Sequence, residues 1–221
     1  MTRRQLAALI DHTFLKAAGD PGAVEKLCAE ARKHRFACAM VNPAEVARAA
    51  ELLDGSEVRV GTVVGFPLGQ NTVRMKCAEA VETVEAGALD IDYVLNIRDL
   101  RTKPSDEVLE DLTLLNLAPK KVCEDVVTKL IIECCYLSDD EKVLACRLAK
   151  KAGFDFVKTS TGFGSGGATL EDVALMRKTV GKGMGVKAAG GIRTLEDAMK
   201  MIEAGANRIG CSSGVSIIES L

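Results

Sequence analysis

Short apolar runs alternate with longer amphipathic segments along the chain, from Leu9 to the C-terminus. The longer segments place apolar residues three and four positions apart, the period of an α-helix, as in Ala23–His34, Thr72–Ala86, Asp139–Ala152 and Leu170–Val180. The short runs are rich in Val and Ile, which favours buried β-strands. The predicted strands are Ala8–Asp11, Ala37–Val41, Val58–Gly65, Ile91–Asn96, Val127–Glu133, Phe154–Ser160, Val186–Ala189 and Arg208–Ser212.

No linker or low-complexity stretch interrupts this alternation, so we expect residues 1–221 to form a single α/β domain. Three segments are similar: EAGALD, KKAGFD and EAGANR. Each predicts that a helix ends at its glycine (Gly87, Gly153 or Gly205) and that the next strand follows. Eight strands with intervening helices fit a (β/α)8 TIM barrel. A doubly wound parallel sheet alternates in the same way, so periodicity alone leaves both folds open.

The placement of the polar residues favours the barrel. In such a fold the residues that carry chemistry gather where the parallel strands end. Charged and amide side chains interrupt or close several of the apolar runs: Asp11, Asp92, Asn96, Glu133, Lys158 and Lys187. We therefore expect these side chains to lie together at one end of the barrel.

Two of these residues are lysines on consecutive strands. Neighbouring strands lie about 5 Å apart, so inward-facing ammonium groups of Lys158 and Lys187 would repel each other and one would lose its proton more readily. A neutral lysine attacks carbonyl carbons and forms a Schiff base, whose iminium accepts electrons. A single lysine at a strand end is more often a solvated or salt-bridged group. Asp92 is either a structural carboxylate paired with Lys129 or Lys187, or a general base working through water.

Two glycine-rich segments, AAGGIRT and IGCSSG, follow the last two predicted strands and lead into helices. Barrel enzymes commonly bind phosphate at this position through backbone N–H groups. Gly190 and Gly191 would allow close approach of the backbone, and Ser212 and Ser213 could donate hydroxyl groups. Plain turn chemistry is the alternative interpretation of each segment. Together they predict that the substrate is a phosphorylated carbonyl compound.

Composition excludes several other classes of protein. The chain has 221 residues, 48% of them hydrophobic, and a net charge of −2 with no basic block, so neither nucleic acid nor a membrane is an expected partner. Its eight cysteines are scattered without CxxC spacing, which predicts reduced thiols. The two histidines, His12 and His34, do not form a metal-binding cluster. No signal peptide or membrane span is present, so we expect a cytoplasmic protein.

Seven segments in the same order, DHTFLK, VVGFPLG, DIDYVLN, KLIIE, FVKTSTGFGSGGAT, VKAAGGIRT and RIGCSSG, closely resemble the deoxyribose-phosphate aldolase family. The resemblance runs from Leu9 nearly to the C-terminus. It implies a class I aldolase on a (β/α)8 barrel that uses neither metal nor cofactor and commonly forms homodimers or homotetramers. The implied reaction is the reversible cleavage of 2-deoxy-D-ribose 5-phosphate to glyceraldehyde 3-phosphate and acetaldehyde.

The resemblance also implies roles for particular residues. It makes Lys158 the Schiff-base lysine, Lys187 the second lysine and Asp92 the catalytic aspartate, the same three residues that the charge argument selects. Residues that would bind the substrate phosphate are Gly162, Gly190, Gly191, Arg193, Ser212 and Ser213. Residues that would line the pocket are Asp11, Thr13 and Leu15. Lys129 and Glu133 share a face of the fifth predicted strand, so we also expect them to form a charge network around Asp92.

The sequence departs from the usual family pattern at Ala17, Met40 and Arg98, where proline, cysteine and glycine are common. Met40 is expected near the pocket and Arg98 at its rim. Two alternatives remain open: an aldolase or isomerase for a different sugar phosphate, and a catalytically silent barrel that binds phosphorylated metabolites or a protein.

Overall fold

The computed structural model describes residues 1–221 and contains a closed barrel of eight parallel strands. The strands are β1 (Ile10–Phe14), β2 (Cys38–Val41), β3 (Arg59–Val64), β4 (Asp90–Val94), β5 (Val127–Ile131), β6 (Phe156–Lys158), β7 (Gly185–Ala189) and β8 (Arg208–Cys211). Each strand pairs with the next along the chain, and β8 pairs with β1. This closure confirms the predicted (β/α)8 barrel and excludes the doubly wound sheet.

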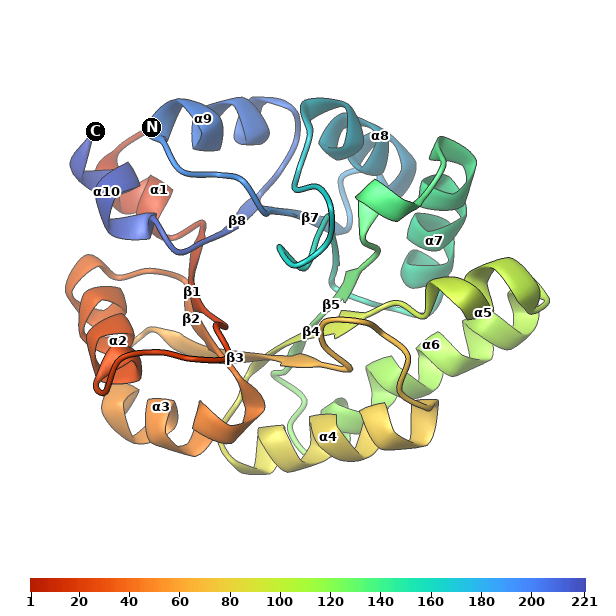
Figure 1. Ribbon diagram of the computed structural model, residues 1–221, viewed down its shortest axis with the longest axis horizontal. Coiled ribbons are helices and arrows are strands. Elements are labelled where there is room, and N and C mark those ends of the chain that lie inside the picture. Colours follow the sequence, from red (N-terminus) through yellow and green to blue (C-terminus); the bar gives the residue numbers. More distant parts are fainter.

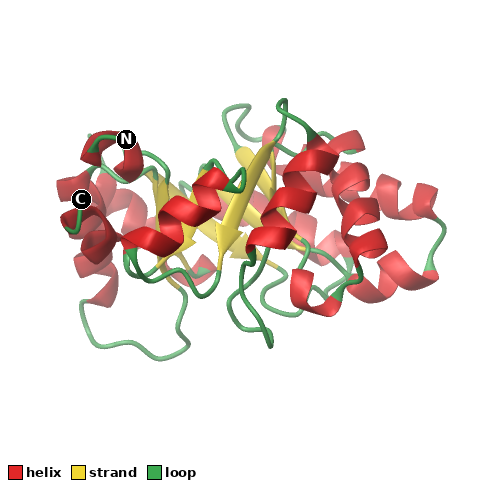
Figure 2. Cartoon of the chain, turned by 90° about the horizontal axis from the view of Figure 1, so that it is seen from above, coloured by secondary structure: helices red, strands yellow, loops and turns green.

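Helices surround the barrel (Figure 1), and the strands lie between them when the molecule is turned by 90° (Figure 2). The α-helices are α1 (Arg3–Ala7), α2 (Ala23–His34), α3 (Val46–Leu53), α4 (Val73–Glu85), α5 (Ile97–Thr102), α6 (Ser105–Lys120), α7 (Asp139–Lys151), α8 (Leu170–Val180), α9 (Leu195–Glu203) and α10 (Gly214–Glu219). Two 3₁₀ helices, η1 (Pro43–Glu45) and η2 (Cys134–Tyr136), follow β2 and β5. No helix has both the length and the apolar character needed to cross a membrane.

The three alanine-glycine segments end helices as the sequence predicts. Gly87, Gly153 and Gly205 follow α4, α7 and α9 with φ angles of 111°, 84° and 117°, a region that favours glycine. In each case the glycine N–H and the next N–H donate back to carbonyls of the last helical turn, as Gly205 does to Ile202 and Ala206 to Met201. The same glycine turn therefore connects a helix to the next strand of the barrel at three places.

The first strand lies further along the chain than predicted. Thr2 and Gln5 form a capping box that starts α1, a helix that the apolar pattern does not predict. The strand then begins at Ile10 and runs through Asp11, His12 and Thr13. It tolerates these polar side chains because each has a hydrogen-bonding or ionic partner.

Alternate residues of the strands face different surroundings. Val157, Leu130 and Val186 are buried in the apolar layer between the barrel and the helices. The residues between them point into the barrel, where Lys158 pairs in register with Lys187. Because successive residues of a strand point to opposite faces, the charged side chains lie inside the barrel and the apolar side chains pack against the helices.

Candidate active site

The three residues with predicted catalytic roles meet inside the barrel. Lys158 is the last residue of β6, and its Nζ donates a hydrogen bond of 2.8 Å to Oδ2 of Asp92 on β4. Nζ of Lys187 on β7 donates to the same oxygen at 2.7 Å. The Lys158 residue is 4% exposed, and Asp92 and Lys187 are 0% exposed. One carboxylate oxygen is thus shared by two almost fully buried amines.

Burial is the main reason why Lys158 is easy to deprotonate. Burial lowers the pKa of Lys158, Asp92 raises it and Lys187 lowers it again, with a net value of about 8. The repulsion by Lys187 that the sequence predicts as the cause of the low pKa contributes, but burial has the larger effect. At Lys187 burial also lowers the pKa, but Asp11 and Asp92 together raise it above the usual value.

Asp92 remains ionised in this setting. Burial would raise its pKa, but Lys158, Lys187 and Lys129 hold the pKa well below its usual value. Oδ1 of Asp92 lies 3.3 Å from Lys129 Nζ, and no other polar group reaches it at hydrogen-bonding geometry. The carboxylate therefore contacts three amines, and its Oδ1 is the oxygen without a hydrogen bond.

More charged residues inside the barrel contact Lys187 and Lys129 from the side away from Lys158. Asp11 Oδ2 lies 2.5 Å from Lys187 Nζ, and Asp11 Oδ1 accepts a hydrogen bond of 2.8 Å from Arg208. Lys129 contacts Asp90, which also accepts a hydrogen bond from Arg59. Sequence reasoning missed Asp90 and Arg208. Asp90 could have been found from the same period of two, because it lies two residues before Asp92 on the same strand face.

The expected network of Lys129 and Glu133 around Asp92 is half wrong. Lys129 does lie beside Asp92, but β5 ends at Ile131 and the chain turns at Glu133. Glu133 has a left-handed backbone, with φ of 56°, and its carboxylate contacts Thr161 instead. Period-two reasoning fails here because the chain has already left the strand.

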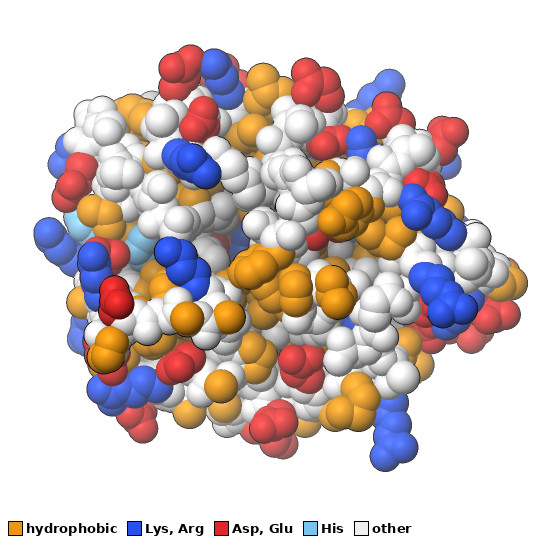
Figure 3. Space-filling model, viewed as in Figure 1, with side chains coloured by type: hydrophobic (Ala, Val, Ile, Leu, Met, Phe, Trp, Pro, Cys, Tyr) orange, Lys and Arg blue, Asp and Glu red, His pale blue; other side chains and the backbone are white.

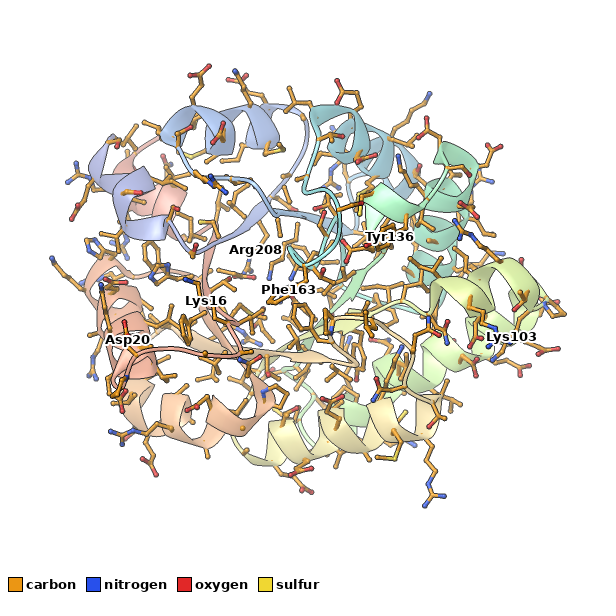
Figure 4. All side chains as sticks on the ribbon, viewed as in Figure 1. Lys16, Asp20, Lys103, Tyr136, Phe163 and Arg208 are labelled. Carbon is orange, nitrogen blue, oxygen red and sulfur yellow. The ribbon has the colours of Figure 1, made fainter.

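A cavity of about 330 Å³ opens above Lys158, between the loops that follow β1, β6, β7 and β8. Of the residues with predicted binding roles, it is lined by Thr13, Leu15, Gly162, Gly190, Gly191, Arg193 and Ser212. Ser213 lies next to it at the start of α10, and Asp11 is buried beneath it with Lys187. Lys16 also lines the cavity and adds a cation that the sequence reasoning did not select. Figure 4 shows Lys16, Phe163 and Arg208 around the central opening, far from Lys103 on the outer helices.

The glycines of the cavity wall have backbones that suit anion binding. Gly162, Gly190 and Gly191 have φ angles of 85°, 87° and 83°. A side chain at Gly190 would come within 2.9 Å of the Gly167 backbone, so the two loops touch there. The wall therefore offers glycine-rich backbone close to the cations of Arg193 and Lys16, a combination that can hold a phosphate.

One side of the cavity mouth is apolar. Phe163, which is 55% exposed, lines the cavity and packs edge to face against Phe66, with ring centroids 5.2 Å apart. Phe66 packs in turn against the buried group of Leu15, Cys38, Met40 and Val63, so Met40 lies behind the cavity wall. Arg98 lies exposed on α5 and does not border the cavity. Figure 3 shows hydrophobic side chains gathered near the middle of this face, beside a hollow.

A family model, two related sequences and one solved structure that resemble this chain are all those of aldolases. A model of the DeoC/LacD family aldolases matches residues 6–220. Deoxyribose-phosphate aldolase from Bacteroides thetaiotaomicron is 52% identical, covering 98% of this chain and 90% of the relative. The enzyme of that name from Caldanaerobacter subterraneus subsp. tengcongensis is 55% identical, covering 97% of this chain and 92% of the relative. A solved structure of deoxyribose phosphate aldolase from Aeropyrum pernix, described as a unique tetramer, has a TM-score of 0.90 at 33% identity and covers 99% and 92% of the two chains.

Proposed function

The chain belongs to the DeoC/LacD family of aldolases, and from this membership we infer that it is a deoxyribose-phosphate aldolase. The reaction is the reversible cleavage of 2-deoxy-D-ribose 5-phosphate to glyceraldehyde 3-phosphate and acetaldehyde through a lysine Schiff base. The observation that carries the proposal for the site is the buried Lys158 amine, hydrogen-bonded at 2.8 Å to Asp92 and with a pKa of about 8. An amine of this kind is a nucleophile near neutral pH.

We propose that Lys158 attacks C1 of the open-chain sugar and that the resulting carbinolamine loses water to give an iminium. Asp92, supported by the Lys187 cation, accepts the proton of the C3 hydroxyl, directly or through a water molecule. The C2–C3 bond then breaks, its electron pair moves into the iminium to form an enamine, and glyceraldehyde 3-phosphate leaves. Protonation of the enamine at C2 and hydrolysis release acetaldehyde and restore the amine. The iminium is the electron sink, so these steps need no metal ion or cofactor.

We assign the phosphate end of the substrate to the glycine-rich wall of the cavity. Gly162, Gly190 and Gly191 would offer backbone N–H groups, Arg193 a cation and Ser212 a hydroxyl, with Ser213 beside it at the start of α10. Thr13 and Leu15 would contact the sugar carbons, while Asp11 would act from beneath the cavity by holding Lys187. The positive φ angles of these glycines and the cation of Arg193 in the same cavity wall support this orientation.

Reduction with borohydride in the presence of acetaldehyde tests the mechanism. The expected product is a stable two-carbon adduct on Lys158, located by peptide mass mapping. The Lys158→Arg variant, which keeps the charge but not a neutral amine, should give no adduct and no cleavage. An adduct on any other lysine, or none in the wild-type protein, would contradict the assignment of Lys158. Analysis of the products from 2-deoxy-D-ribose 5-phosphate separates this enzyme from an aldolase for a different sugar phosphate.

We also propose that residues 1–221 act as one aldolase domain in the cytoplasm and associate as a homo-oligomer. All eight cysteines are free thiols, which suits a reducing compartment. The described tetramer of the Aeropyrum pernix relative supports self-association, which light scattering would measure.

A further inference from the structure

Glu133 has a backbone conformation that its residue type disfavours. Its φ and ψ angles are 56° and 66°, and Arg35 is the other non-glycine residue with positive φ. The Glu133 residue is 4% exposed, and it lies two residues after the end of β5. A strained, buried, ionisable residue at the end of a barrel strand persists only if the surrounding contacts hold it there.

Those contacts all lead to one loop. The Glu133 carboxylate accepts hydrogen bonds from Thr161 N at 3.1 Å and from Thr161 Oγ1 at 2.5 Å. Thr161 Oγ1 accepts in turn from Phe163 N at 3.0 Å. Gly164 lies so close that a side chain there would come within 3.2 Å of the Glu133 carboxyl carbon. The carboxylate therefore forms the buried hydrogen bonds of the loop that contains Gly162 and Phe163, both of which line the cavity.

The backbone around Glu133 explains why the side chain reaches this loop. Ile132 N donates to the Lys158 carbonyl at 3.0 Å, and Cys134 N donates to the Thr159 carbonyl at 2.9 Å. The backbone hydrogen bonds between the segments that follow β5 and β6 thus continue on both sides of Glu133, which has a left-handed backbone conformation. A right-handed or extended conformation would point the carboxylate elsewhere and leave the Thr161 hydroxyl and N–H without this partner.

We propose that Glu133 is a positioning residue that fixes the loop after β6, so that Gly162 and Phe163 are held where the phosphorylated substrate binds. This proposal rests on the proposed function. It adds that the loop after β6 must be held in place for substrate binding, by a residue that does not contact the reacting atoms. Glu133 does not line the cavity, and the Schiff-base amine has its own partner in Asp92. Loss of the hydrogen bonds between Glu133 and Thr161 should therefore weaken substrate binding and leave the reactivity of Lys158 intact.

The Glu133→Gly variant tests this, because glycine accepts the left-handed backbone and removes only the carboxylate. We expect the KM for 2-deoxy-D-ribose 5-phosphate to rise about tenfold, as expected for loss of charge-assisted hydrogen bonds, with kcat within about threefold of wild type. Borohydride trapping of acetaldehyde on Lys158 should be unchanged, because acetaldehyde has no phosphate. Glu133→Gln should keep KM near the wild-type value, since its amide can still accept from Thr161 N and donate to Thr161 Oγ1.

Arg35→Gly is the matched control, since it makes the same backbone change at the exposed end of α2, and its KM should equal that of the wild type. If Glu133→Gly does not fold, Thr161→Val removes the hydroxyl that donates to the Glu133 carboxylate and should also raise KM. An unchanged KM in folded Glu133→Gly or Thr161→Val would overturn the proposal, as would a loss of trapping equal to the loss of cleavage. Failure of the wild-type protein itself to trap acetaldehyde would instead refute the proposed function.

Discussion

At the scale of single residues, the reactivity of Lys158 results from opposing effects. Burial lowers its pKa, the carboxylate of Asp92 raises it, and the Lys187 cation lowers it. Without Asp92 the amine would be neutral over a wider pH range but would have no acceptor for the substrate proton. Without burial it would be an ordinary surface lysine, protonated at neutral pH. The structure places an amine with a lowered pKa 2.8 Å from an ionised carboxylate.

The pH dependence of cleavage should report this pKa. Because Lys158 must be neutral to attack, kcat/KM should rise with pH and level off above about pH 8, and should fall by about tenfold per unit in more acidic solution. Initial rates with 2-deoxy-D-ribose 5-phosphate over a range of buffers measure the profile. A kcat/KM that stays constant well below pH 8 would show that another group keeps the amine neutral.

Asp92→Asn should separate Schiff-base formation from carbon-carbon cleavage. An amide cannot accept the C3 hydroxyl proton, so kcat should fall by about a hundredfold or more. Trapping of acetaldehyde on Lys158 should persist, because removing Asp92 removes an influence that raises the pKa of the amine. Asp99→Asn on α5, where Asp99 pairs with Lys103, is the control and should retain wild-type kcat. Loss of trapping in the folded Asp92→Asn variant would mean that Asp92 acts in the first step.

At the scale of elements, the glycines that end helices fix where strands begin. Gly205 lies between α9 and β8, and a side chain there would come within 2.8 Å of Arg177, whose Nε donates to the Gly205 carbonyl. Its φ of 117° adds backbone strain for any other residue. The position is thus closed to substitution for two independent reasons.

Gly205→Ala should lower the free energy of unfolding by more than about 1 kcal/mol, through strain and the clash with Arg177. Urea unfolding followed by circular dichroism measures the change. Gly183→Ala is the control: it lies in the exposed turn before β7, where a side chain would meet nothing within 4 Å, and should be neutral or slightly stabilising. Equal midpoints for both variants would contradict the conformational argument.

The sequence predicts most elements because apolar residues must face the layer between barrel and helices. Helices Ala23–His34 and Leu170–Val180 are found with their exact bounds, and seven of the strands within a few residues. The first strand is predicted to end at Asp11, where the apolar run ends, but it continues through the polar residues His12 and Thr13 to Phe14. The turn at Glu133 is missed because a left-handed glutamate leaves no mark in an apolar pattern.

At the scale of the whole molecule, the barrel interior works as a connected array of charges. Arg208, Asp11, Lys187, Asp92 and Lys158 form successive contacts of 2.8, 2.5, 2.7 and 2.8 Å from one end of the barrel to the nucleophile. Register alone predicts the Lys158 and Lys187 pair. The predicted barrel places the strands of Asp11 and Arg208 side by side, but the sequence does not show which inward-facing side chains Asp11 contacts.

This array should make stability sensitive to acid. Burial would raise the pKa of Asp11, but Lys187 and Arg208 lower it from 3.8 to about 2. The ionised carboxylate therefore stabilises the fold fully above pH 3.8, and this contribution is lost as the pH falls through about 2. Arg208→Met removes one cation, raises the pKa of Asp11 and should move the acid unfolding midpoint, measured by circular dichroism, to higher pH.

Arg48→Met provides the comparison, because Arg48 forms only exposed ion pairs with Glu25 and Glu51. Its acid midpoint should match that of the wild type, as exposed pairs contribute little. Equal shifts in the two variants would indicate a general effect of charge rather than the buried contact with Asp11.

The pairing of β8 with β1 also has a consequence for the order of events during synthesis. The ribosome makes Lys158 before Lys187 and Arg208, and an incomplete chain cannot bury the amine inside a closed ring of strands. Until the last strand joins the first, the burial that lowers the pKa of Lys158 is incomplete. The low pKa of this amine is therefore a property of the closed barrel and not of any one strand.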